Sequence, residues 1–181
     1  MEAKAILYHS NEESKCNEFI TNDDFLIMSK NKYDDIWLGY GMYFWDNLGN
    51  AKWWKNSQMH RNSKSIYRIV AANVSLERLL DLTDIDITNK FNELWNETCK
   101  KIGEKDNVGL GKKLNCLFEM FNLEKTYDII KVFGKYNRMP NKGFIQFDYK
   151  SSNPEPTIAT KCIYSVRNVN CIIEKEICKG E

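Results

Sequence analysis

The sequence has little proline, little histidine and almost no net charge. Its 26 Lys and Arg residues nearly balance 25 Asp and Glu residues, which leaves a formal net charge of +1. A charge this small creates no overall field that would attract the chain to nucleic acid or to a membrane surface. The composition therefore excludes a protein that binds polyanions through its total charge and leaves room only for a local basic patch.

Long apolar runs are missing as well. The run RIVAANV at residues 68–74 is among the longest, and it is too short to span a bilayer. The N-terminal residues MEAKAILYHSNEE contain no basic segment followed by an apolar one, as a secretory signal would. We therefore expect a cytoplasmic protein with no membrane partner. At 181 residues and 43% hydrophobic content, residues 1–181 suit a single domain with a sizeable core.

The cysteines and histidines form no recognisable metal-binding pattern. Six cysteines are scattered along the chain without a CxxC pair, and there are only two histidines, His9 and His60. Zinc sites need clustered thiols and imidazoles at regular spacing, and disulfide scaffolds need a denser cysteine framework. We expect reduced, mostly buried thiols and no metal.

Strands and helices are expected to alternate over the first two thirds of the chain. Short apolar runs predict strands at residues 4–10 and 65–74. Apolar positions at helical spacing predict helices at residues 11–20, 47–61, 86–104 and 109–123. Ser10 or Asn11 is a candidate cap for the first helix, and Asn47 or Asn50 for the second.

The last third of the sequence has the character of a β-sheet. Runs of β-branched and aromatic residues are separated there by clusters of Gly, Pro, Asn and Ser, which predicts strands at residues 127–133, 142–149, 161–167 and 170–177. All three prolines fall in the connections of this region. An α+β domain with antiparallel strands late in the chain follows from this order.

One stretch concentrates rings and glycines in an unusual way. Residues 37–47, WLGYGMYFWDN, hold five aromatic rings and two glycines. A core strand would alternate its rings with polar residues and would avoid glycine, which gives it no side chain to pack. Gly39 and Gly41 therefore indicate a close approach of the backbone, and the rings are placed to wall a cleft.

Three separated segments together resemble a known family. LYHS ends the first predicted strand, WLGYGMYFWDNLGNAKWW follows about 30 residues later, and GFIQFDY precedes a late strand that ends in VRN. This order is similar to the ADP-ribosyltransferase superfamily of the His-Tyr-Glu type, which includes the diphtheria-toxin-like and poly(ADP-ribose)-polymerase-like enzymes, and resembles its small bacterial or phage members most. The resemblance covers most of the chain except residues 76–135, and it implies a split antiparallel sheet with flanking helices.

The resemblance implies a site for NAD+, used as a substrate, and no metal. In it, Tyr43 would stack on nicotinamide with Trp53 as the second wall, His9 would bind the adenosine ribose hydroxyls, and backbone groups of Ser10 would hold the nicotinamide amide. Ser10 stands where the family has glycine. Other residues that the resemblance places in the NAD+ site are Tyr8, Gly41, Phe44 and Asn50.

The position of the catalytic glutamate is occupied by a different residue. Alignment on Phe144 places Gln146 there, and Gln carries no charge with which to stabilise a developing cation. Strand period puts Asp148 on the same face, so this residue is the alternative source of a carboxylate. The catalytic set expected from the sequence is therefore His9, Tyr43, Gln146 and Asp148.

Two classes of function stay open at this point. The first is an enzyme, plausibly a toxin or effector, that transfers ADP-ribose from NAD+ to a macromolecular acceptor and releases nicotinamide. The second is a related domain that has lost this chemistry and binds a nucleotide or a partner protein. The acceptor, protein or RNA or DNA, depends on loops rather than on the NAD+ cleft and is left undecided, as is an antitoxin or inhibitor partner.

Overall fold

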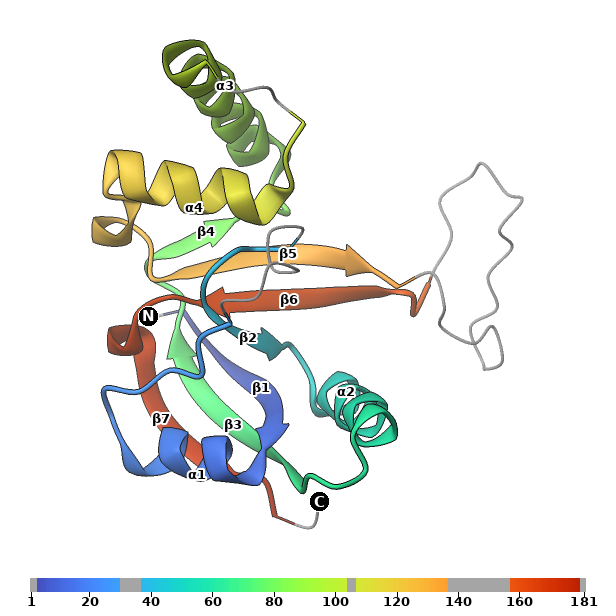
Figure 1. Ribbon diagram of the computed structural model, residues 1–181. Coiled ribbons are helices and arrows are strands. Elements are labelled where there is room, and N and C mark those ends of the chain that lie inside the picture. The colour runs from blue at the N-terminus through green and yellow to red at the C-terminus, as the bar shows by residue number, and fades with distance from the viewer. Residues whose placement is uncertain (1–2, 30–36, 104–106, 137–156, 180–181) are drawn as a thin grey trace.

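The computed structural model describes residues 3–29, 37–103, 107–136 and 157–179. These residues form an α+β structure in which one sheet carries helices at both of its ends (Figure 1). The elements, in chain order, are β1 (Lys4–Glu12), α1 (Glu13–Thr21), β2 (Met42–Trp45), α2 (Leu48–Arg61), β3 (Tyr67–Ser75), β4 (Leu79–Asp81), α3 (Ile85–Ile102), α4 (Leu110–Phe121), η2 (Leu123–Lys125), β5 (Ile129–Lys135), β6 (Thr160–Val166), η3 (Val169–Cys171) and β7 (Ile172–Ile177).

The sheet has seven strands in the order β4-β5-β6-β2-β1-β3-β7. Neighbouring strands run antiparallel except β4 and β5, which are parallel, so the sheet is mixed, whereas the resemblance implies an antiparallel one. The parallel pair arises because β4 and β5 are joined by α3 and α4, a crossover long enough to return the chain in the same direction. The sequence pattern had missed β4 because it is only three residues long.

The two halves of the sheet separate between β1 and β2. These strands pair only at Tyr8 and Trp45, whereas β1 and β3 pair along their full length, from Lys4 with Ser75 to Glu12 with Tyr67. In Figure 1, β5 and β6 run across the picture while β1, β3 and β7 slope down it. The last residues of β1 therefore have no strand partner on the β2 side. The space left between the two strands borders a cavity that these residues line.

The helices confirm most of the expectations from the sequence. The side chain of Asn47 caps α2 by accepting a hydrogen bond from the Asn50 amide at 2.9 Å. The expected cap of α1 was wrong, because Ser10 and Asn11 still belong to β1 and the residue before the helix is Glu12, which makes no side-chain cap bond. None of the helices in the described part of the chain has the length and apolar content needed to cross a bilayer.

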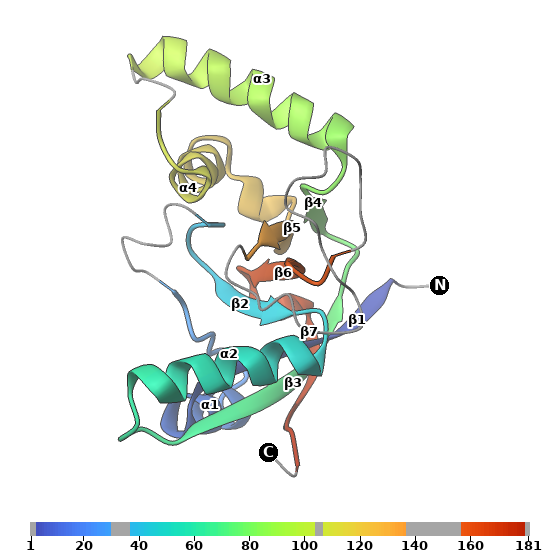
Figure 2. The same ribbon diagram turned by 90° about the vertical axis from the view of Figure 1, so that its right-hand side faces the viewer.

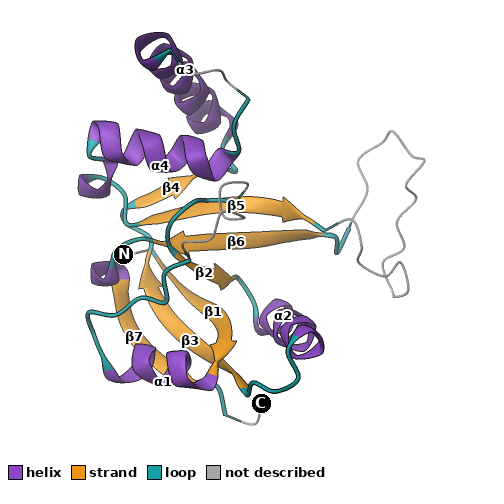
Figure 3. Cartoon of the chain, in the orientation of Figure 1, coloured by secondary structure: helices purple, strands orange, loops and turns teal. Residues whose placement is uncertain are grey.

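Figure 3 shows the strands and the helices that flank them. Two apolar clusters lie on opposite faces of this sheet. The first joins α1 to the sheet and includes Phe19 and Phe44, whose rings meet edge to face with centroids 6.3 Å apart. The second joins α2 and α4 to the sheet and includes Trp45 and Leu114. Neighbouring residues of β2 thus point to different faces, as strand geometry requires. The rings of Tyr43 and Trp45 belong to the side that carries α2.

None of the six cysteines forms a disulfide, but their burial differs from the expectation. Only Cys16 and Cys171 are buried, while the other four are partly exposed. Burial raises the pKa of Cys16 to about 11, which makes its thiol inert at neutral pH.

Candidate functional site

A cavity of about 540 Å³ opens where β1 and β2 separate. Its walls come from the end of β1, from β2, from one face of α2 and from the loop before β2. Two further hollows border β7, and their described lining residues include neither a histidine nor an aromatic ring. We therefore take the cavity between β1 and β2, called here the β1–β2 cavity, as the candidate site.

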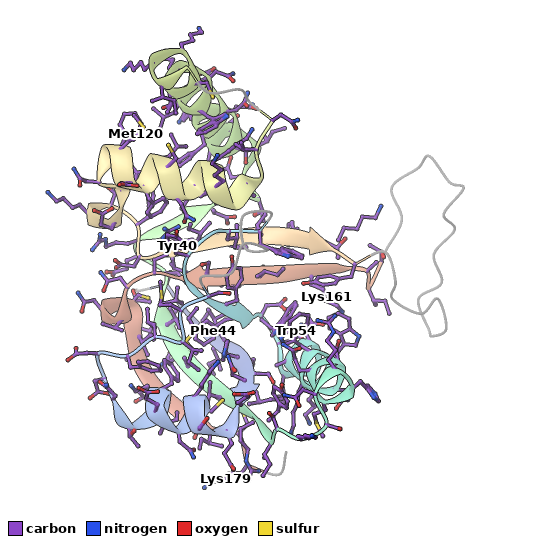
Figure 4. All side chains as sticks on the ribbon, viewed as in Figure 1. Tyr40, Phe44, Trp54, Met120, Lys161 and Lys179 are labelled. Carbon is purple, nitrogen blue, oxygen red and sulfur yellow. The ribbon has the colours of Figure 1, made fainter. Side chains whose placement is uncertain are left out.

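The β1–β2 cavity brings together four residues that the sequence had pointed to: His9, Ser10, Tyr43 and Phe44. They come from two strands separated by more than 30 residues in the chain. Phe44 and Trp54 mark the two sides of this region, one on β2 and the other on α2 (Figure 4). His9 contacts the Phe44 ring, with ring centroids 5.6 Å apart.

Four other expected residues lie outside the described lining of the cavity. The side chain of Tyr8 packs into the second core cluster, on the opposite side of β1 from its neighbour in the chain. Asn50 is occupied at the start of α2, where its side chain donates to Asp46 at 3.1 Å. Gly41 lies against Ser165. Trp53 packs against other rings, among them Tyr136 at 5.2 Å between centroids.

The two candidates for the catalytic acid, Gln146 and Asp148, lie outside the described residues, as does the predicted strand at 142–149. Among the described residues that line the cavity, Glu12 is the one carboxylate, and its Oε1 accepts a hydrogen bond from the Ser65 hydroxyl at 3.1 Å. The sequence analysis did not identify Glu12, because its neighbours in the chain form no motif and a glutamate among polar residues is usually exposed to solvent.

His9 is held as a neutral imidazole with a defined tautomer. Its Nδ1 lies 2.6 Å from the carbonyl oxygen of Tyr43, and a carbonyl only accepts, so Nδ1 carries the hydrogen. Its Nε2 then accepts from the Asn11 amide at 3.2 Å. Burial, with a smaller contribution from the charge of Lys15, lowers the pKa of His9 to about 4, although the bond to the Tyr43 carbonyl acts in the opposite direction. His9 therefore presents an acceptor nitrogen at neutral pH.

Ser10 contributes a buried hydroxyl with no partner in the described part of the chain. The residue is 4% exposed, and its Oγ makes no hydrogen bond there. A buried polar group without a partner costs about 1–3 kcal/mol, so native structures contain few of them. An unpaired hydroxyl in the wall of a cavity is an observation that favours a bound ligand with polar groups.

The loop that carries Trp37 is anchored from two directions. The Tyr43 hydroxyl accepts from the Leu38 amide at 3.0 Å and donates to the Gly39 carbonyl at 2.7 Å. From α4, Asn115 accepts hydrogen bonds from the Tyr40 amide at 3.0 Å and from the Arg167 guanidinium at 3.1 Å. These bonds hold Trp37 in the cavity wall, where its ring stacks on Tyr136 with centroids 5.8 Å apart.

Both the backbone conformation and the close neighbours at position 39 require glycine. The sequence had predicted such a close approach of the backbone at Gly39. Its φ is +71°, and a Cβ at this position would lie 2.7 Å from the Gly111 carbonyl oxygen and would overlap the Asn115 side chain. Gly103 offers a matched comparison, because its φ is +68° but no atom of the described residues lies within 4 Å of an added Cβ. Substitution of Gly103 therefore tests the effect of the positive φ on stability, and substitution of Gly39 tests that effect together with the steric clash.

We expect Gly103→Ala to lower the free energy of unfolding by about 1 kcal/mol and Gly39→Ala to lower it by about 3 kcal/mol. The difference reflects the displacement of α4 backbone by the new methyl group. Urea unfolding of the two variants measures both values. Equal losses in the two variants would contradict the close contact between the Gly39 loop and α4.

Several aromatic residues of the wall had no assigned role in NAD+ binding. Taken one by one, Trp37, Trp45 and Trp54 are expected from the sequence to be packing residues, and Tyr136 carries no motif, yet all four line the cavity. Their rings contact one another, with Trp45 lying 6.0 Å from Trp54 and 5.9 Å from Tyr136 between centroids. Tyr136 directly follows β5, which contains Gly134. An aromatic residue at the end of a glycine-containing strand is the one sequence signal that could have identified it.

The comparisons with protein-family models, with curated proteins and with solved structures found no match to this chain. Within the described residues, no cluster of three His, Cys, Asp or Glu side chains is arranged to hold a metal ion. The function is therefore inferred from the residues of the β1–β2 cavity.

Proposed function

We propose that this protein transfers ADP-ribose from NAD+ to a macromolecular acceptor and releases nicotinamide. The observation that carries the proposal is the β1–β2 cavity, in which a neutral His9, the ring of Tyr43 and the unpaired Ser10 hydroxyl meet. These are residues of the motifs that resemble the His-Tyr-Glu ADP-ribosyltransferases. The proposal includes a cytoplasmic location, where NAD+ is present and the free thiols stay reduced.

The cavity suits the chemistry of breaking the bond between nicotinamide and ribose. NAD+ carries a cationic nicotinamide, and its ribose becomes oxocarbenium-like as the bond to nitrogen breaks and neutral nicotinamide leaves. Aromatic faces attract cations, and Tyr43 and Trp37 supply such faces in the described wall. The acceptor nucleophile then bonds to the ribose carbon and loses its proton to solvent or to a base. Water in place of the acceptor would make the reaction a hydrolysis.

His9 and Ser10 fit the polar groups of such a ligand. The Nε2 of His9 is an acceptor that the Asn11 side-chain amide occupies in the free protein, and a ribose hydroxyl, which is a donor, would take the place of that amide. The Ser10 hydroxyl both donates and accepts, so it suits the carboxamide of nicotinamide. Binding would thus give the buried Ser10 Oγ the partner that it lacks in the free protein.

A second candidate function is a domain of this type that binds a nucleotide or a partner protein, such as an antitoxin, without chemistry. The observation that favours it is the single carboxylate in the described lining. Glu12 already accepts a hydrogen bond from Ser65, and it lies three residues beyond His9 on β1. Without a carboxylate near the reacting ribose, the developing positive charge would be stabilised by ring faces alone.

One reaction distinguishes these candidates. The purified protein is incubated with NAD+ labelled in its adenylate and with cell lysate, and both free nicotinamide and transferred label are followed. Label that is sensitive to nuclease indicates a nucleic-acid acceptor, and label that is sensitive to protease indicates a protein acceptor. Nicotinamide without transfer indicates hydrolysis. Binding of NAD+ with no product would favour the second candidate.

We expect Ser10→Ala to have opposite effects on stability and on binding. Removal of a buried hydroxyl without a partner should raise the free energy of unfolding by about 1 kcal/mol, while the affinity for NAD+ should fall about tenfold. Urea unfolding and calorimetric titration measure the two quantities. A loss of stability in this variant would mean that Ser10 is a structural residue, which would remove it from the site.

A further inference from the structure

Two cations from different helices border the β1–β2 cavity. Lys15 lies on α1 and Arg61 is the last residue of α2, and both belong to the described lining. Both are exposed, and no described carboxylate lies within ion-pair distance of either one. The two helices overlap in the view of Figure 2, but Figure 1 shows them on either side of β1 and β3. The fold therefore brings two positive charges to one cavity without neutralising them.

The cations share the cavity lining with the end of β1. Glu12 is three residues beyond His9 on an extended strand, which places it roughly 10 Å further along. Glu12 pairs with Tyr67, and both line the cavity together with Lys15 and Arg61. The lining also holds the stacked rings of Trp37 and Tyr136. The cavity thus offers charged groups as well as aromatic rings.

The Arg61 side chain is already oriented by a neighbour. Its guanidinium carbon lies 5.7 Å from the centroid of the Trp54 ring, one of the walls. Stacking on a ring leaves the N–H groups at the edge of the guanidinium available, and these groups match two oxygens of a phosphate at once. The charge of Lys15 acts on the His9 imidazole. Lys15, His9 and Arg61 all line the β1–β2 cavity, so both cations can contact one ligand there.

We propose that Lys15 and Arg61 bind the diphosphate of a dinucleotide whose nicotinamide end lies among the rings. A diphosphate carries two negative charges, and two cations from two helices, neither of which forms an ion pair with a described carboxylate, complement it. The assignment rests on the proposed function, since the orientation of the ligand follows from His9 and Tyr43. It adds a recognition element that the sequence motifs do not contain.

Two ligands that share a part of NAD+ test this assignment. ADP-ribose contains the diphosphate, and nicotinamide riboside contains no phosphate. Binding of each is measured by calorimetry at low and high salt, with the wild-type protein and with the double variant Lys15→Ala, Arg61→Ala. We expect the double variant to bind ADP-ribose at least tenfold more weakly, with a smaller salt dependence, and to bind nicotinamide riboside as the wild type does.

Two single variants control for charge and position. Lys90→Ala removes an exposed lysine from α3, outside the described lining, and should leave both affinities unchanged. Glu12→Gln removes the negative charge beside the cations and should strengthen the binding of ADP-ribose two- to threefold. An increase of this kind is not produced by partial unfolding.

The outcomes separate this assignment from the proposed function. Unchanged binding of ADP-ribose by the double variant would overturn the assignment and leave the proposed function standing. Equal loss of both ligands would mean that the cations support the shape of the cavity, which would also overturn the assignment. A wild-type protein that binds neither ligand would overturn the proposed function together with it.

Discussion

Tyr43→Ala is expected to lower the rate of nicotinamide release from NAD+, measured as kcat/KM, at least 100-fold. This loss corresponds to roughly 3 kcal/mol of transition-state stabilisation. The substitution removes an aromatic face from the cavity wall and both hydrogen bonds that the Tyr43 hydroxyl makes to the loop at Leu38 and Gly39. Trp37 is carried by the same loop, so a second ring loses its fixed place.

A conservative variant separates these two contributions. Tyr43→Phe keeps the ring and removes only the hydroxyl, so we expect a rate loss of about tenfold and a lower free energy of unfolding by about 1–2 kcal/mol. Tyr40→Ala is the matched control, because Tyr40 is 48% exposed on the same loop and lies outside the described lining. Nicotinamide release with Tyr43→Ala at the wild-type rate would exclude the β1–β2 cavity as the site of reaction.

The stability of the protein is expected to depend on pH through His9. Burial lowers the pKa of His9 from 6.5 to about 4 in the folded state. Between these two values the unfolded chain binds a proton at this position and the folded chain does not, so stability rises with pH across the window. The contribution is roughly 3 kcal/mol, since one pKa unit corresponds to about 1.4 kcal/mol. It is lost as the pH falls from 6.5 toward 4.

Urea unfolding at a series of pH values tests this dependence. The difference in free energy of unfolding between pH 7 and pH 4 should be roughly 3 kcal/mol smaller in His9→Gln than in the wild type, whatever the other groups contribute. His60→Gln controls for the removal of a histidine, because His60 lies exposed near the end of α2. The same pH dependence in wild type and His9→Gln would show that the folded protein accommodates the charged imidazole.

The elements that local signals define were predictable from the sequence. The cap of α2 depends only on Asn47 and the amide of Asn50, three residues later. The strands β1, β3, β5, β6 and β7 all fall on apolar runs recognised in the chain. Predictions failed where a local signal and a distant contact favour different structures. Asn11 is a common helix-capping residue, but it continues β1 because it pairs with Arg68 of β3.

The site was predictable only in part. The motifs pointed to His9 and Tyr43 together, and the structure joins them by one hydrogen bond. Trp53 and Trp54 show the limit of this approach. Successive positions on a helix point about 100° apart, so one of them lines the cavity and the other packs against rings, and the choice depends on how α2 docks on the sheet.

The α+β class and most of the strands and helices could be predicted from the order of the amino acids, because they depend on periodicity and on contacts within a few residues. Three features follow only from the folded arrangement: β1 and β2 separate after Tyr8, the Ser10 hydroxyl is buried without a partner among the described residues, and Lys15 and Arg61 share one cavity. Each of these depends on segments distant in the chain, whose relative positions are set by packing of the whole sheet against its helices.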